Sequence, residues 1–133
     1  MIHQVRVIFG DTDQLGVVYY ANYLRYFEAA RAAYLRSLGS GQRDLETWGL
    51  ALPVVEAHCR YVQPAHYEDL LDVDLTVDAV RGASLRFCYE IRRQATVIAR
   101  GHTIHACIDP EGKPRRMPPE LKALLANHDA ASN

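Results

Sequence analysis

The chain has 133 residues and a mass of 15.0 kDa, which is the size of one folded domain around one hydrophobic core. Its 15 lysines and arginines and 16 acidic residues give a formal net charge of -1, so the overall basic field typical of nucleic-acid or anionic-lipid binders is missing. No segment approaches the roughly 18 apolar residues of a membrane span, and the first ten residues have no secretion-signal pattern. We expect a cytoplasmic protein with no nucleic-acid partner.

The first half of the chain predicts a strand, a loop and a long helix. Residues 4–9 alternate in the manner of a short strand, and a loop then runs from Gly10 to Gly16. From about Tyr19 to Leu38 apolar residues recur every three or four positions, which predicts a helix that ends at Gly39 and Gly41. A short helix over 44–48 follows, with Asp44 as its N-cap. The predicted buried stripe of the long helix comprises Tyr23, Phe27, Ala30 and Tyr34, widened by Leu24, Leu35 and Leu38.

From residue 52 onward the apolar period changes to two, which is typical of half-buried strands. Turn residues at 81–82, 94–95 and 110–112 separate these strands, and a final helix over about 119–126 precedes a tail that we expect to be frayed. One helix followed by antiparallel strands buries both element types when the sheet wraps around the helix, so we expect a single α+β domain over 1–133. The predicted strands are Leu52–Val62, Leu70–Val80, Ser84–Arg93 and Val97–Asp109.

The most informative segment is the acidic loop that leads into the long helix. Unpaired N–H groups of a first helical turn carry partial positive charge, which suits a developing oxyanion, and a glycine lets the chain approach a ligand. Asp13 is then placed to act on a carbonyl, either as a nucleophile or as a base that activates water. Asp11, Thr12 and Asp13 are equally consistent with residues that only shape the loop and cap the helix.

Residues 9–31, FGDTDQLGVVYYANYLRYFEAAR, resemble the signature of the hotdog-fold acyl-CoA thioesterases, specifically the 4-hydroxybenzoyl-CoA thioesterase group and its Tol-Pal-associated branch. That signature runs from an aromatic residue through D-T-D or D-C-D, a glycine, V-x-Y or V-x-W and an asparagine or serine to a helix with an aromatic residue and A-R. The resemblance covers nearly the whole chain, because similar residues stand in the family at Pro53, Tyr61, 64–65, Asp69 and 81–84.

The resemblance implies a thioester hydrolase that needs no cofactor and no metal. Asp13 would be the catalytic carboxylate, and the backbone N–H of Tyr20 would bind the oxyanion. A histidine often replaces Tyr20 in the Tol-Pal-associated branch, which leaves that main-chain donor unchanged. Family members place the site between subunits, so we expect a dimer or a homotetramer built as a dimer of dimers. The other implied substrate contacts are Gly16, Val18 and Asn22, with Pro53 and Val54 across the dimer. Asn22 and Asp11 would also support the loop.

Coenzyme A carries phosphates, which require local cations. Arg81 and Ser84 correspond to part of a basic turn that related thioesterases use for this purpose, and Arg115 and Arg116 form a second basic cluster. Each of these charges is also consistent with an ordinary solvated loop.

Two further residue types are expected to have no chemical role. His102 and His105 lie in a strand pattern, where a spacing of three points them to opposite faces and argues against zinc. Cys59, Cys88 and Cys107 lack C-x-x-C spacing and indicate reduced core thiols. The alternatives to an acyl-CoA thioesterase are an acyl-carrier-protein thioesterase and a non-catalytic acyl-CoA binding or scaffold subunit. The acid at position 13 favours the enzyme.

Overall fold

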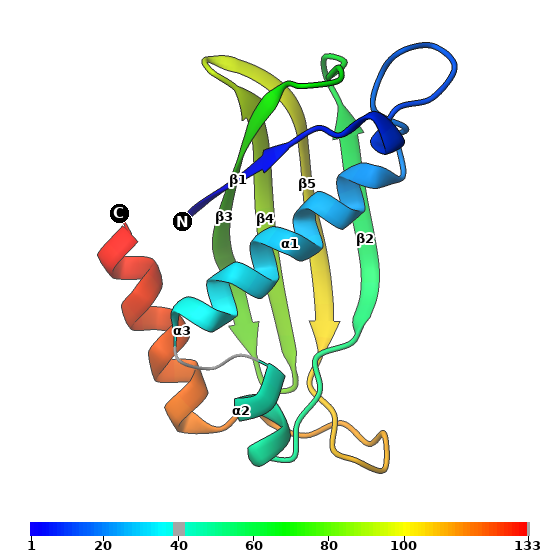
Figure 1. Ribbon diagram of the computed structural model, residues 1–133. Coiled ribbons are helices and arrows are strands. Elements are labelled where there is room, and N and C mark those ends of the chain that lie inside the picture. The colour runs from blue at the N-terminus through cyan, green and yellow to red at the C-terminus, as the bar shows by residue number, and fades with distance from the viewer. Residues whose placement is uncertain (39–41, 133) are drawn as a thin grey trace.

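The computed structural model describes residues 1–38 and 42–132, with side chains described for 1–38 and 45–125. It contains a five-stranded antiparallel sheet in the order β1-β3-β4-β5-β2, and the long helix α1 crosses one face of this sheet (Figure 1). The predicted α+β architecture is confirmed. The elements are β1 (Ile2–Arg6), the 3-10 turn η1 (Phe9–Asp11), α1 (Asn22–Ser37), α2 (Gln42–Thr47), β2 (Val54–Tyr61), β3 (Leu70–Arg81), β4 (Ser84–Arg93), β5 (Thr96–Ala106) and α3 (Pro119–Ser132).

The start of the chain differs most from the sequence prediction. The first strand ends at Arg6, and Phe9 lies in η1 with 75% of its surface exposed instead of continuing the strand. Helix α1 begins at Asn22, three residues later than predicted, because the N–H of Tyr19 bonds to the carbonyl of Asp11 and holds Tyr19 in the loop.

Two features of the helices also differ from the prediction. Leu24, predicted to widen the buried stripe, is 39% exposed, whereas Tyr26 is buried. Helix α3 continues through Ser132, beyond the predicted end near residue 126. The roles predicted for Gly39 and Gly41, and for the side chain of Asp44, lie outside the described residues.

Helix α1 sits directly on the sheet through Phe27. The ring of Phe27 stacks on Tyr89 with centroids 4.2 Å apart and planes within 8°. It also covers Gly101, where a Cβ atom would lie 2.8 Å from the ring and 2.2 Å from the carbonyl oxygen of His58. Glycine at this position of β5 therefore permits the close approach that fixes α1, and with it the helix N-terminus, against the sheet.

Candidate active site

The loop 10–16 folds around the carboxylate of Asp13. The N–H of Leu15 donates to Asp13 Oδ1 over 2.9 Å, and the N–H of Gly16 donates to the Asp13 carbonyl over 3.0 Å. Gly16 adopts φ +80°, a conformation that glycine takes at little cost. One carboxylate oxygen is thus anchored by the backbone, while Oδ2 accepts no hydrogen bond from any residue that the structure describes.

Asp11 and Thr12 shape the loop from within. The Asp11 carboxylate is buried and accepts the hydroxyl of Tyr26 over 2.8 Å. Its carbonyl accepts both the N–H of Tyr19 and the side-chain amide of Asn22, each over 2.9 Å. The Thr12 hydroxyl donates to a carbonyl of the preceding turn over 2.7 Å. Asn22, predicted as a substrate contact, therefore already holds the loop to the helix.

The N-terminus of α1 has no side-chain cap. Its N-cap residue is Ala21, so the alternative that the loop acids cap this helix is wrong. The N–H groups of 22–24 bond to carbonyls three residues earlier, but the N–H groups of Tyr20 and Ala21 donate to no residue within the described parts of the chain. The Tyr61 hydroxyl donates to the Tyr20 carbonyl over 3.1 Å and ties the end of β2 to the helix start.

Asp13 and Tyr20 face the same cavity of about 310 Å³. Burial raises the pKa of Tyr23, and burial with Cys59 alongside raises that of Tyr61 to about 12, so both phenols stay neutral near pH 7. Asp13 and Tyr20, the residue two positions before the first residue of α1, thus line one partly aromatic pocket. A carboxylate beside a helix N-terminus is an arrangement able to polarise and attack a carbonyl. The cavity is lined by Asp13, Val17, Val18, Tyr20, Tyr23, Tyr61, Val62, Gln63 and Pro64.

The residues singled out from the sequence fall into two groups at opposite ends of the sheet. The first group, around the Asp13 pocket, lies at the end where the loop enters α1, whereas α2 marks the other end (Figure 1). The second group is linked there by backbone bonds: Ala106 N–H to the Pro53 carbonyl, and Arg115 N–H to the Cys107 carbonyl. This second group contains Pro53, Val54, Arg81, Ser84, Arg115 and Arg116.

The two groups do not meet within one chain. The eight residues of β2 separate them by about 25 Å of extended strand. Arg115 is also partly engaged, since its Nη1 donates to the Trp48 carbonyl over 2.9 Å. The predicted phosphate and acyl contacts thus require a second chain if they serve the Asp13 pocket.

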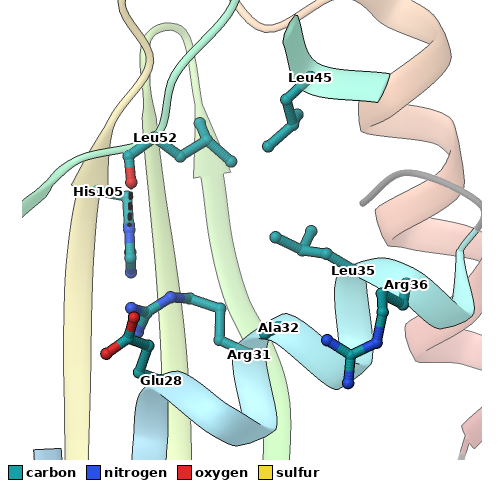
Figure 2. Close-up of a pocket in the computed structure, with 8 residues that line it drawn as sticks. All are labelled: Glu28, Arg31, Ala32, Leu35, Arg36, Leu45, Leu52 and His105. Carbon is teal, nitrogen blue, oxygen red and sulfur yellow. Dashed lines mark hydrogen bonds between the residues drawn. The ribbon is translucent and has the colours of Figure 1, made fainter. Parts of the chain in front are cut away.

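A second cavity, of about 340 Å³, lies between α1 and β5 (Figure 2). Glu28 and Arg31 reach from α1 toward His105, whereas Arg36 points away. A chain of polar side chains lies beside this cavity and was not predicted, although Thr103 and His105 interrupt the apolar face of a strand. Its contacts run from Arg31 Nη1 to Tyr89 Oη (3.0 Å), Tyr89 Oη to Thr103 Oγ1 (2.6 Å), Thr103 Oγ1 to His105 Nε2 (2.8 Å), and His105 Nδ1 to the Leu52 carbonyl (2.9 Å).

The histidines and cysteines were predicted partly correctly. His105 is buried, while His102 stacks on His58 with ring centroids 5.3 Å apart, so the predicted opposite directions are confirmed. The cysteines are free thiols, but only Cys107 is fully buried, since Cys59 and Cys88 are half-exposed. Among the described side chains, those of residues 1–38 and 45–125, no set of three or more His, Cys, Asp or Glu is placed to bind a metal ion. The helices within 1–38 and 42–132 are too short or too polar to cross a bilayer.

Fold and site together define an α+β protein with an acidic loop beside the N-terminus of its long helix, and the chain is similar to known proteins over most of its length. A sequence profile of the thioesterase-like superfamily matches residues 7–125. The acyl-CoA thioesterase YbgC of Haemophilus influenzae is 40% identical over 123 residues, covering 91% of this chain and 90% of that protein. The acyl-CoA thioester hydrolase YbgC of Escherichia coli O6:H1 is 34% identical and matches over 90% of each chain.

Comparison with solved structures gives the same family. The crystal structure of a 1,4-dihydroxy-2-naphthoyl-CoA thioesterase from Synechocystis matches with a TM-score of 0.88 and 31% identity, covering 96% of each chain. The chain belongs to the thioesterase-like superfamily. The predicted hotdog fold and the predicted enzyme class, a thioester hydrolase, are confirmed by these relatives.

Proposed function

We propose that this protein hydrolyses acyl-CoA thioesters in the Asp13 pocket. The observation that carries the proposal is that Asp13 and Tyr20, just before α1, line one cavity. Within the described residues, neither Asp13 Oδ2 nor the Tyr20 N–H has a hydrogen-bond partner, while Asp13 Oδ1 is anchored by the Leu15 N–H. The YbgC relatives, named for acyl-CoA thioesterase activity and 34 to 40% identical, support the same substrate class.

In this proposal the thioester carbonyl oxygen points at the N–H of Tyr20. Attack on the carbonyl carbon moves an electron pair onto that oxygen, and the N–H together with the positive end of α1 stabilises the resulting charge. Asp13 either attacks directly, giving an anhydride that water then hydrolyses, or takes a proton from the attacking water. In both routes the carbon–sulfur bond breaks, coenzyme A leaves as its thiolate, and the products are a carboxylic acid and free thiol.

We further propose that the complete site needs two chains. Strand β2 is a sheet edge and all but one of its residues are exposed. Antiparallel pairing of β2 with its own copy brings the Val54 end of one strand beside the Tyr61 end of the other. Pro53 and Val54 of one chain then lie near the Asp13 pocket of the other chain. Arg81 and Arg115, at the same end of the sheet as Pro53, approach the opening of that pocket.

The proposal is tested by measuring free thiol released from short aliphatic, long aliphatic and aromatic acyl-CoA substrates. We expect the wild-type protein to release coenzyme A from at least one of them with turnover. Stoichiometric binding without thiol release from any substrate would favour an acyl-CoA binding subunit instead.

A further inference from the structure

We propose that Tyr26 is a positioning residue. By holding Asp11, it keeps the Asp13 carboxylate and the Tyr20 N–H in a fixed position relative to each other. The inference rests on the proposed function, because it concerns the geometry of the same pocket. Tyr26 does not line that pocket. It acts on the pocket through one buried hydrogen bond, which its hydroxyl donates to the Asp11 carboxylate.

The bond is the main support of a buried charge. Asp11 is only 4% exposed, and it is the one acidic side chain that is buried among the described residues. A carboxylate removed from water needs strong partners. Tyr26 donates over 2.8 Å, whereas the N–H of Ile8 lies at 3.4 Å and Arg25 Nη1 at 3.5 Å. Arg25 is also 69% exposed at its side chain, so Tyr26 is the short and shielded contact.

Asp11 connects the Tyr26 hydroxyl to the two groups of the proposed site, the Asp13 carboxylate and the Tyr20 N–H. Its carbonyl is held by the N–H of Tyr19, the residue directly before Tyr20, and by the side chain of Asn22 at the start of α1. Asp13 follows only two residues later along the same backbone. A shift of Asp11 therefore moves the carboxylate at 13 and the donor at 20 relative to each other.

Tyr26 itself is held rigidly. It is 4% exposed on α1 and packs edge-to-face on Tyr23, which lines the Asp13 pocket, with ring centroids 5.9 Å apart. Burial, together with the Asp11 carboxylate, raises the pKa of Tyr26, so its hydroxyl remains a donor at physiological pH. Phenylalanine would keep the ring packing and remove only the donor.

The test compares Tyr26→Phe with Tyr34→Phe, which removes an equally buried hydroxyl two turns further along α1. We expect Tyr26→Phe to lower kcat about 10- to 100-fold with a much smaller change in KM, because misplaced groups slow the chemical step more than binding. Tyr34→Phe is expected to lower Tm by a comparable amount and to leave kcat near wild type. Equal kcat values for Tyr26→Phe and wild type would overturn the proposal.

A double-mutant cycle with Asp11→Asn checks the route. If Tyr26 acts through Asp11, the two losses in kcat are not additive, whereas fully additive losses would contradict that route.

Amide hydrogen exchange of the free protein gives a readout that needs no activity. Tyr26→Phe should speed exchange at Tyr19, and Tyr34→Phe should not. Unchanged exchange at Tyr19 would reject the positioning role, whereas faster exchange in a protein without thioesterase activity would reject only the proposed function.

Discussion

At the scale of single residues, the loop conformation depends on Gly16. Its φ of +80° lies in the left-handed region, and a Cβ there would meet nothing within 4 Å, so any cost of substitution comes from the backbone alone. We predict that Gly16→Ala lowers the free energy of unfolding by about 1–2 kcal/mol and also lowers kcat, because relaxing the strain moves Asp13.

Gly10 provides the matched control for urea unfolding and steady-state kinetics. It lies in the same loop, has equally open space at its Cβ and has no positive φ. Gly10→Ala should change stability by less than about 0.5 kcal/mol. Equal effects of the two substitutions would show that backbone conformation at 16 does not shape the site.

Local chemistry made part of this site readable from the sequence. The glycine, the acids and the helical period together indicated that Asp13 lies near the N-terminus of the long helix, whereas the role of the Tyr20 N–H was implied by the family resemblance. The contact between the Tyr61 hydroxyl and the Tyr20 carbonyl was not readable, since it joins residues 41 positions apart through strand packing. Burial of Asp11 was missed because it depends on how the loop folds back onto α1, where the Tyr26 hydroxyl donates to the Asp11 carboxylate.

At the scale of elements, regular two-residue alternation predicted the strands well where one face is buried. Strand β4 occupies Ser84–Arg93 as predicted, because every second side chain from Leu85 to Ile91 is buried. The first strand was misplaced, since the chain leaves the sheet into the 3-10 turn that buries Asp11, and alternation alone carries no sign of that turn. Edge strand β2 shows the alternation but little burial, because it lies at the edge of the sheet and all but one of its residues are exposed.

The polar chain under α1 predicts a pH dependence of stability. Burial, with Arg31 contributing, lowers the pKa of His105 below its ordinary 6.5, so the folded protein holds this histidine neutral. Below pH 6.5 the unfolded chain binds a proton at His105 that the folded chain does not, so the free energy of unfolding falls as the pH falls. The slope from this group is at most about 1.4 kcal/mol per pH unit.

The measurement is urea unfolding of wild type and His105→Gln between pH 7 and pH 5. This window lies above the titration of Asp69 and Glu90, whose pKa values are lowered from 3.8 and 4.5 because hydrogen bonds and arginines outweigh the opposing effect of burial. The variant should be less stable at pH 7 but should lose less stability on acidification. Parallel pH profiles would contradict the assignment to His105.

At the scale of the whole molecule, the sheet offers two edges for association, β1 and β2. We predict that β2 is the edge that pairs, because both halves of the site lie at its two ends. Val55→Lys places a charge on β2 at a position that is 58% exposed, which should leave the fold intact, yield monomers and abolish most activity. Light scattering with size-exclusion chromatography reports the oligomeric state.

The control uses the other edge. Ile2→Lys introduces the same charge on β1 at a position that is 56% exposed, and it should leave both assembly and activity unchanged. Loss of assembly in the β1 variant alone would place the interface on the opposite edge and would remove the reason to join the two residue groups into one site.

The central claim, hydrolysis by Asp13, is tested most directly by Asp13→Asn. The substitution keeps the size of the side chain and an oxygen that can accept the Leu15 N–H, but removes the charge. The measurement is kcat for thiol release from the best acyl-CoA substrate, beside calorimetric binding of that substrate. The account predicts a loss in kcat of about 100-fold or more with binding retained. A variant that hydrolyses the substrate within a few-fold of the wild-type rate would contradict it.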